Sequence, residues 1–304
     1  NIIGAGYTAL NQFSNAINHY KAALKLEPKN AEVLNNLGLT FKAIGDFKKA
    51  NECFENSISI KPNFAEAFNN MALSLKEERK FEKAIVSLEK AIALKNNYAE
   101  AYYNLGNVYN LLGELEKSIN MFTRAIDIKS DYFDAYNNLG AVYNLKKDYD
   151  KAYQNIQKAI SLNPNNADAY NNLGTSALNL NKEDEAIAHY NKAISIDPKL
   201  IIAYSNLCGL FEKSNNLKEV ENILEKTKEF KLDQFGEIKF HEAQLFSRNK
   251  DFDRSILLLK SIDDNEISEK TKMKKYGLLG KDFDKVKNYK EAFKYFQKTN
   301  ELVK

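Results

Sequence analysis

Residues 133–166 read FDAYNNLGAVYNLKKDYDKAYQNIQKAISLNPNN, and their pattern recurs along the chain. Its tripeptide Asn-Leu-Gly also ends at Gly38, Gly106 and Gly174, and Ala72 stands at the skipped interval. The small residue of a second motif keeps the same 34-residue interval at Ala50, Ala84, Ser118, Ala152 and Ala186. The chain is therefore an array of near-identical units.

Each unit has the periodicity of two amphipathic helices. Apolar residues recur at i, i+3, i+4 and i+7 on both sides of a Gly-Asp or Lys-Asp turn, which favours an antiparallel helix pair. Small residues such as Gly38, Ala50 and Ser57 stand where these helices should cross, at interaxial distances of about 8–10 Å. The prolines Pro28, Pro62, Pro164 and Pro198 are expected to end one helix pair and start the next, since proline is tolerated in the first turn of a helix but not in its interior.

The units resemble the tetratricopeptide-repeat (TPR) family. In the fourth full unit the matching residues are Tyr136, Leu139, Gly140, Tyr143, Ala152, Ala159 and Pro164, at positions 4, 7, 8, 11, 20, 27 and 32. The resemblance implies an all-α fold, a right-handed α-solenoid (superhelix) of tandem tetratricopeptide helix-turn-helix repeats.

The register predicts a single solenoid over residues 1–304 that opens inside a truncated repeat. The predicted units are 1–30 (partial), 31–64, 65–98, 99–132, 133–166, 167–200, 201–234, 235–272 (degenerate) and 273–304. Between 201 and 272, Val220, Thr227 and Glu242 occupy positions that are small elsewhere. Neither end has a recognisable polar cap, so self-association through the end faces is expected.

The composition argues against a nucleic-acid partner, a disulfide and membrane insertion. The 304 residues carry 44 Lys and Arg against 41 Asp and Glu, and the net charge of +3 is spread along the chain, which argues against a nucleic-acid partner. Cys53 and Cys208 lie too far apart in a linear stack to form a disulfide, which suits a cytoplasmic location. No apolar run is long enough to insert into a membrane, and no signal peptide is recognisable.

The main candidate site is a column of asparagines at position 6. It consists of Asn36, Asn70, Asn104, Asn138, Asn172 and Asn206. In this family position 6 lines the concave groove, and a carboxamide offers both a donor and an acceptor to a peptide backbone. The column resembles the asparagine ladder in the repeat arm of protein O-linked N-acetylglucosamine transferase. The alternative is that asparagine at position 6 is inherited consensus without a binding role.

Neighbouring columns extend this interpretation. Position 5 holds Asn35, Asn69, Asn137 and Asn171, which predicts an unusually polar groove wall. The acidic residues at position 2, Glu32, Glu66, Glu100, Asp134 and Asp168, are interpreted first as helix-dipole partners and second as a basic-peptide site. The chaperone-tail binders of this family place a Lys at position 5 of their first repeat, whereas this chain has Asn35, so that ligand is not expected.

The sequence contains no recognisable motif for catalysis, metal binding or nucleotide binding. His19, His189 and His241 are isolated in sequence, and no Cys or His cluster has metal-ligand spacing. No phosphate-binding glycine loop is present, and neither cysteine has a neighbouring His. The sequence therefore predicts no enzyme activity, no cofactor and no metal, and a protein or peptide as the partner.

The last repeat suggests an alternative function. Residues 276–304, YGLLGKDFDKVKNYKEAFKYFQKTNELVK, resemble the final repeat that precedes a sulfotransferase domain in a group of bacterial proteins. On this interpretation the chain is the substrate-recruiting arm of a larger enzyme, a sulfotransferase in the first place and an O-linked glycosyltransferase in the second, whose catalytic domain lies beyond Lys304. The abundance of Lys, Asn and Ile suggests a bacterial source.

Overall fold

The computed structural model describes residues 2–303, and the fold is an all-α solenoid with no strand among those residues. Its first ten helices are α1 (Ile2–Ala9), α2 (Phe13–Leu26), α3 (Ala31–Ala43), α4 (Phe47–Ile60), α5 (Ala65–Glu77), α6 (Phe81–Leu94), α7 (Ala99–Leu111), α8 (Leu115–Ile128), α9 (Phe133–Leu145) and α10 (Tyr149–Leu162). The others are α11 (Ala167–Asn179), α12 (Glu183–Ile196), α13 (Ile201–Lys213), α14 (Leu217–Glu229), α15 (Gly236–Arg248), α16 (Phe252–Ser261), the 3-10 turn η1 (Asp264–Glu266), α17 (Glu269–Lys285) and α18 (Tyr289–Val303).

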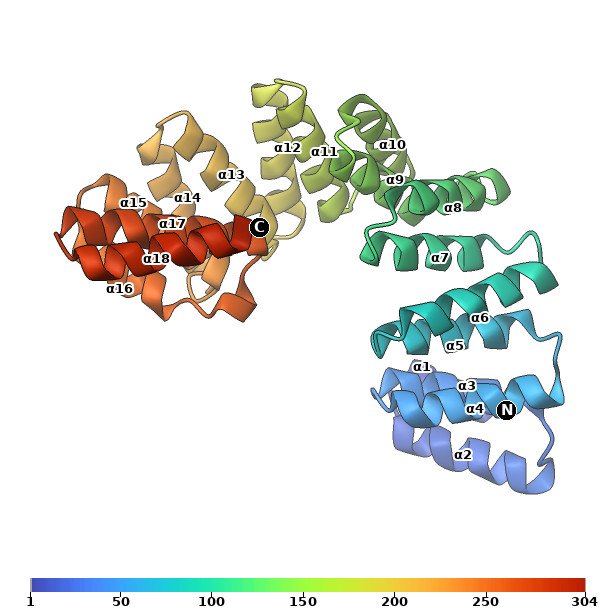
Figure 1. The fold of residues 1–304 in the computed structure, drawn as a ribbon. Coiled ribbons are helices and arrows are strands. Elements are labelled where there is room, and N and C mark those ends of the chain that lie inside the picture. The colour runs from blue at the N-terminus through green and yellow to red at the C-terminus, as the bar shows by residue number, and fades with distance from the viewer. Residues whose placement is uncertain (1, 304) are drawn as a thin grey trace. The chain divides into compact units, whose positions relative to one another are not determined.

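The helices form two compact units, residues 1–162 and residues 163–304. Within the first unit each odd-numbered helix packs against the even-numbered helix that follows, and the hairpins stack on one another (Figure 1). The odd-numbered helices α3, α5, α7 and α9 also contact one another in sequence. In the second unit, α11 contacts α13, α13 contacts α15, and α15 contacts α17. The odd-numbered helices of each unit therefore form a continuous row.

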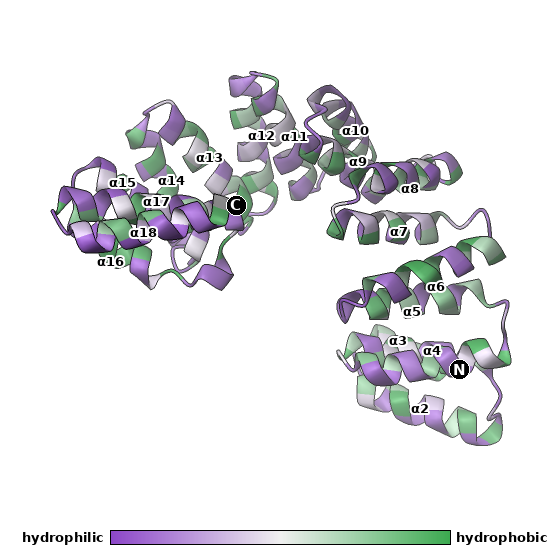
Figure 2. Ribbon diagram, viewed as in Figure 1, coloured by the Kyte–Doolittle hydropathy of each residue, from purple (hydrophilic) through white to green (hydrophobic). Residues whose placement is uncertain are grey.

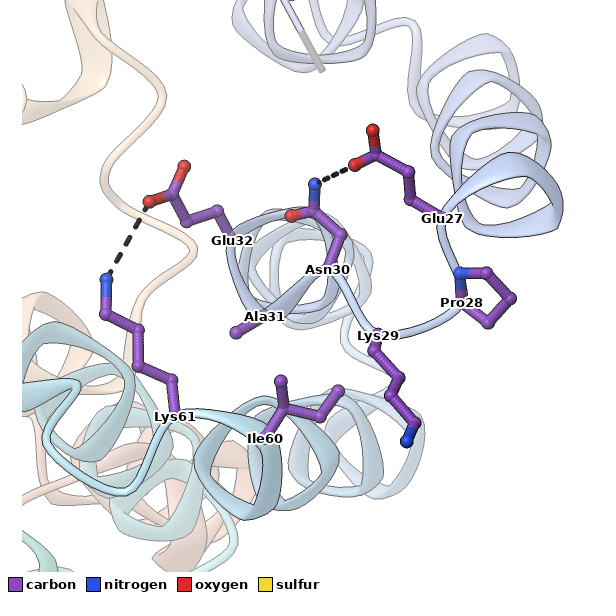
Figure 3. A pocket seen from close by; sticks show the side chains of 8 residues that line it. All are labelled: Glu27, Pro28, Lys29, Asn30, Ala31, Glu32, Ile60 and Lys61. Carbon is purple, nitrogen blue, oxygen red and sulfur yellow. Dashed lines mark hydrogen bonds and ion pairs between the residues drawn. The ribbon is translucent and has the colours of Figure 1, made fainter.

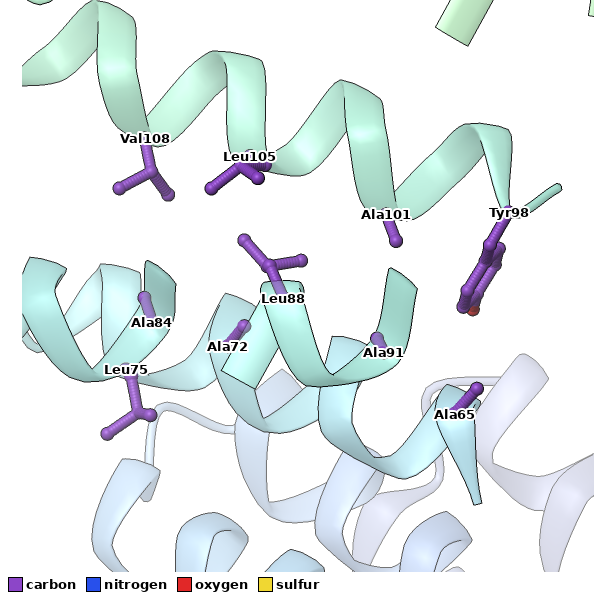
Figure 4. Close-up of a cluster of buried hydrophobic side chains, with 10 residues drawn as sticks. All are labelled: Ala65, Ala72, Leu75, Ala84, Leu88, Ala91, Tyr98, Ala101, Leu105 and Val108. Carbon is purple, nitrogen blue, oxygen red and sulfur yellow. The ribbon is translucent and has the colours of Figure 1, made fainter. Parts of the chain in front are cut away.

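Glycine at position 8 allows the two helices of a hairpin to approach closely. A methyl group on Gly38 would lie 2.7 Å from Phe54, and one on Gly106 would lie 2.7 Å from Phe122. In the repeat that carries Ala72 instead, the facing residue is the smaller Leu88, which points toward Leu105 of the next hairpin (Figure 4). The packing role inferred for Gly38 from the sequence is thus confirmed.

Hydrophobic and hydrophilic residues both occur on the helices that Figure 2 labels, as expected for amphipathic helices. Side-chain caps begin several helices, because Asn30, Asp46 and Asn166 accept hydrogen bonds from backbone N–H groups three residues later. The acidic residues at position 2 lie in the first turns of their helices, as the dipole interpretation requires. None of the helices within residues 2–303 combines the length and the apolarity that crossing a membrane requires.

The prolines end the preceding helix pair, as predicted, but they do not lie in the first turn of the next helix. Pro28 follows Glu27, the C-cap of α2, and α3 begins only at Ala31. Pro62 likewise follows Lys61, the C-cap of α4. The proline therefore belongs to the turn that ends the preceding helix, which it cannot continue, and not to the first turn of the next.

The register shifts by one residue after α14. That helix ends at Glu229, and Lys231 adopts a left-handed conformation with φ 58°, so that α15 starts at Gly236. Ala243 then lies sixteen residues before Leu259, the same separation as Gly38 and Phe54, and both are fully buried. The prediction that Glu242 occupies the crossing position, which is small in the other repeats, was therefore wrong, because the extra residue in the linker moves Ala243 into that position.

Candidate peptide-binding face

The asparagines of position 6 all lie on the first helices of their hairpins, and all six are half-buried. In residues 1–162 they are Asn36 on α3, Asn70 on α5, Asn104 on α7 and Asn138 on α9. In residues 163–304 they are Asn172 on α11 and Asn206 on α13. The structure thus places four of the predicted residues on one row of helices in the first unit and two on the row of the second unit.

Hydrogen bonds join this column to the preceding repeat. The Asn70 Nδ2 donates to Asn35 Oδ1 at 3.0 Å, and the Asn104 Nδ2 donates to Asn69 Oδ1 at 2.8 Å. In the second unit the Asn206 Nδ2 donates to Asn171 Oδ1 at 2.9 Å. The separation is 35 residues each time, from position 6 back to position 5 of the previous hairpin.

Asn138 continues the pattern with different acceptors. Its Nδ2 donates to the phenolic oxygen of Tyr103 at 3.1 Å and to Asn107 Oδ1 at 2.9 Å. Burial raises the pKa of Tyr103, although the hydrogen bonds from the asparagines oppose this. Tyr103 stands at position 5 in place of an asparagine, so its phenolic oxygen accepts the hydrogen bond that a carboxamide oxygen accepts in the other repeats.

Three of the four position-5 asparagines are buried and do not form a groove wall. Asn35, Asn69 and Asn171 are only 6%, 5% and 7% exposed, and each accepts the hydrogen bond from the next hairpin. The prediction of a polar wall at position 5 was therefore wrong for these three residues. Their polarity serves the repeat junction, because a buried carbonyl oxygen needs a donor.

These inter-repeat bonds limit what the column can offer a ligand. Asn70, Asn104 and Asn206 each use one N–H for the preceding repeat, and among the described residues their side-chain oxygens accept no hydrogen bond. A carboxamide of this kind can still donate once and accept twice. Asn138 has given both N–H groups to Tyr103 and Asn107, so it can only accept.

His241 is not isolated in the folded chain. Its Nε2 lies 2.9 Å from Ser205 Oγ and its Nδ1 lies 2.9 Å from Glu212 Oε1, and the ring is 4% exposed. A carboxylate beside Nδ1 favours the tautomer with the proton there, so that Nε2 accepts from Ser205. Sequence reasoning missed this group because the register shift after α14 disguises which residues of α13 and α15 face each other. The two contacts of His241 join α15 to α13.

The two cysteines have the character of core residues. Burial raises the pKa of the Cys53 thiol to about 11, and the fully buried Cys208 thiol is shifted in the same direction. Both thiols are therefore protonated at neutral pH, whereas a nucleophilic cysteine needs a lowered pKa. Within residues 2–303 no group of three or more His, Cys, Asp or Glu side chains could hold a metal ion.

A broad depression lies around the loop between α2 and α3 (Figure 3). Its volume is about 870 Å³, but its polar groups pair with one another. Asn30 Nδ2 donates to Glu27 Oε2 at 2.7 Å, and Lys61 lies 3.8 Å from Glu32. Nothing in this arrangement calls for a ligand.

Protein-family models match most of these repeats. Models described as TPR repeat and tetratricopeptide repeat match residues 4–45, 74–113 and 106–147, residues 131–199, and residues 31–64. Together the matches cover more than half of the chain. The chain therefore belongs to the tetratricopeptide-repeat family.

Solved structures agree with this assignment. A crystal structure of MamA is 31% identical with a TM-score of 0.50, over 54% of this chain and 95% of that chain. A tetratricopeptide repeat protein from Parabacteroides merdae reaches a TM-score of 0.66 at 20% identity, over 82% and 97% of the two chains. YrrB, described as a TPR protein with an unusual peptide-binding site, has a TM-score of 0.50 at 18% identity, over 60% and 95%. A comparison with curated proteins finds no match.

Proposed function

We propose that this chain is a protein-interaction scaffold that holds an extended segment of a partner along the asparagine column of the first helices within each of its two units. The observation that carries the proposal is the carboxamide at position 6 of six consecutive repeats, half-buried and with its oxygen facing no protein donor in Asn70, Asn104 and Asn206 among the described residues. Proteins built from these repeats bind peptide or protein partners, and YrrB is described as having a peptide-binding site.

Spacing supports a backbone ligand. Neighbouring helices pack about 9–10 Å apart, and an extended peptide advances about 3.3 Å per residue, so successive rungs match every third residue. A carboxamide recognises the peptide bond itself, whereas the variable position 9 (Leu39, Leu73, Asn107, Ala141 and Thr175) supplies contacts to side chains. The column then gives affinity and position 9 gives selectivity.

The hydrogen bonds to position 5 set the design of the test. Asn104→Ala removes both a rung and the bond to Asn69, whereas Asn69→Ala removes only the bond and leaves the rung in place. Peptides selected from a displayed library would be titrated by fluorescence anisotropy against both variants. We expect Asn104→Ala to weaken binding about fivefold or more, the value of one lost hydrogen bond, while Asn69→Ala has a smaller effect.

Two outcomes would count against the column. Equal losses in both variants would assign the asparagines to repeat stacking alone. No change in either variant, with helicity retained, would place the peptide on another surface.

We further propose that the chain is the substrate-recruiting arm of a larger enzyme, a sulfotransferase or a glycosyltransferase. The same face would then select the substrate polypeptide. Sequencing of the transcript past Lys304 tests this version, because a phosphosulfate-binding or nucleotide-sugar-binding domain in the same reading frame is required. A self-associating scaffold is distinguished by sedimentation velocity over a range of concentrations.

A further inference from the structure

A second polar pocket lies in residues 163–304, remote in sequence from the asparagine column of the first unit. It has a volume of about 580 Å³ and is enclosed by the end of α16, the loop that contains η1, and the helices α17 and α18. The charged lining residues are Lys260, Asp263, Asp264, Lys272, Lys275 and Lys298. Four lysines against two aspartates leave the lining with a formal charge of +2.

Lys275 is an exception among the repeats. It lies five residues before Gly280, and the residues five before the equivalent crossing positions are Val33, Ala67, Ala101, Ala135, Ala169, Ala203 and Ile238, all of them buried. Lys275 is itself only 5% exposed, and its Nζ donates to the Ile262 carbonyl at 2.6 Å and to Asp264 Oδ1 at 2.8 Å. This repeat has thus placed a hydrogen-bonded ammonium where the others place an apolar side chain.

The two carboxylates of the pocket are already engaged. Asp264 accepts from Lys275 and from the Tyr276 hydroxyl, and although burial opposes ionisation, these donors lower the pKa of the Asp264 carboxyl. Asp263 Oδ1 accepts from the backbone N–H of Asn265 at 2.9 Å and from its Nδ2 at 3.0 Å. Asp264 is therefore paired with Lys275, whereas Asp263 is bonded to N–H groups of Asn265 and keeps its negative charge, so the lining retains a formal charge of +2.

Lys260 and Lys298 are held by aromatic rings. The Lys260 Nζ lies 4.8 Å from the centre of the Phe283 ring, and the Lys298 Nζ lies 5.0 Å from that of Tyr276 and 5.6 Å from that of Tyr295. Neither lysine forms an ion pair with any of the described residues. Rings that attract an ammonium restrict its position without neutralising its charge. Two donors are thus arranged at the pocket in advance of any ligand.

We propose that this pocket binds a phosphoryl group, either as free phosphate or on a side chain of a partner polypeptide. The dianion has three acceptor oxygens, which match the ammonium groups of Lys260 and Lys298 and the remaining N–H of Lys275. Because these donors are charged and already positioned, each charge-assisted hydrogen bond forms with little loss of side-chain freedom.

Met273 provides a local reporter for the test. The chain has three methionines, and Met273 lies two residues from Lys275, whereas Met71 and Met121 belong to residues 1–162. Methyl-labelled methionine would be followed by NMR while inorganic phosphate replaces chloride at constant ionic strength. N-acetyl-phosphoserine methylamide would be titrated in parallel, with the unphosphorylated analogue as its control.

We expect a saturable shift of Met273 alone, and binding weakened about fivefold by Lys260→Gln or by Lys298→Gln. Lys294→Gln is the matched control, since Lys294 lies on the same helix as Lys298, pairs with Glu291 at 3.5 Å and does not line the pocket. Tighter binding of the phosphoserine analogue than of phosphate would identify a partner side chain as the source, and the reverse would identify the free ion. A shift that does not saturate, or an equal loss in Lys294→Gln, would overturn the proposal.

Discussion

Asn138 ties α9 to α7 through two hydrogen bonds from one side chain, to the Tyr103 hydroxyl at 3.1 Å and to Asn107 at 2.9 Å. The proposed binding column and the junction between repeats therefore share this residue. A substitution of Asn70, Asn104, Asn138 or Asn206 removes a contact between repeats as well as a rung of the proposed column. This double role determines how the asparagines must be tested.

Removing one acceptor of Asn138 should cost less stability than removing the Asn138 side chain itself. Tyr103→Phe leaves Asn138 bonded to Asn107 but removes the hydroxyl that both asparagines contact, and it should lower the free energy of unfolding by about 0.5–1.5 kcal/mol. Asn138→Ala loses both bonds and should cost about 1–3 kcal/mol. Urea denaturation monitored by circular dichroism measures both, and the opposite ranking would contradict the assigned contacts.

The crossing at Gly106 predicts a compensating pair. Gly106→Ala places a methyl group 2.7 Å from Phe122 and should destabilise by about 1–3 kcal/mol through overpacking. Adding Phe122→Leu reproduces the Ala72 and Leu88 pair of the second full repeat, so the double variant should recover part of the loss. Additive losses in the thermal melts of the two single variants and the double variant would show that the two residues do not share this space.

Gly113 offers a contrasting case, in which the backbone alone decides. Its φ is 73°, and a methyl group added to it would meet no atom within 4 Å. Gly113→Ala should therefore cost about 1 kcal/mol, because a Cβ disfavours the left-handed conformation, without any steric clash. Gly277, which is helical and equally open, is the control, and Gly277→Ala should raise the melting temperature.

Asp282 should make the second unit less stable as the pH rises. The residue is 1% exposed, and its oxygens accept from Ser247 and Ser255 at 2.6 Å each. Burial raises the pKa of the Asp282 carboxyl despite these hydrogen bonds. The folded state therefore holds the proton more tightly than the unfolded state, and the resulting stabilisation is complete below the unfolded pKa of about 3.9 and is lost as pH rises through the folded pKa.

Asp282→Asn isolates this effect, because the amide keeps the shape and cannot ionise. The difference in unfolding free energy between the variant and the parent chain should shift in favour of the variant from about pH 4 upward. Asp264, whose pKa is lowered, has the opposite sign: its contribution is present above the unfolded pKa and is lost as pH falls through the folded pKa. A pH-independent difference for Asp282→Asn would show that Asp282 is not titrating in this range.

The hairpins could be predicted from the sequence because their period and crossing residues are properties of single repeats. Gly38, Gly106 and Gly140 identify their helix crossings without reference to anything outside the repeat. The partners of Asn70 and Asn104 could not be predicted, since each bond joins two hairpins and depends on how they are stacked. The group around His241 was missed for a related reason, because one extra residue in the linker before Gly236 changes which side chains face each other.

The hydrogen bond from position 6 to position 5 has an evolutionary consequence. If recombination deleted residues 65–98, Asn104 would meet Asn35 in place of Asn69, an identical acceptor in an equivalent setting. The contact between neighbouring hairpins is thus the same in these repeats. Unequal crossing-over can therefore add or remove whole repeats in this part of the gene and still leave each position-6 donor with a position-5 acceptor. The tyrosine at 103 marks the first junction where such an exchange would change the chemistry of the bond.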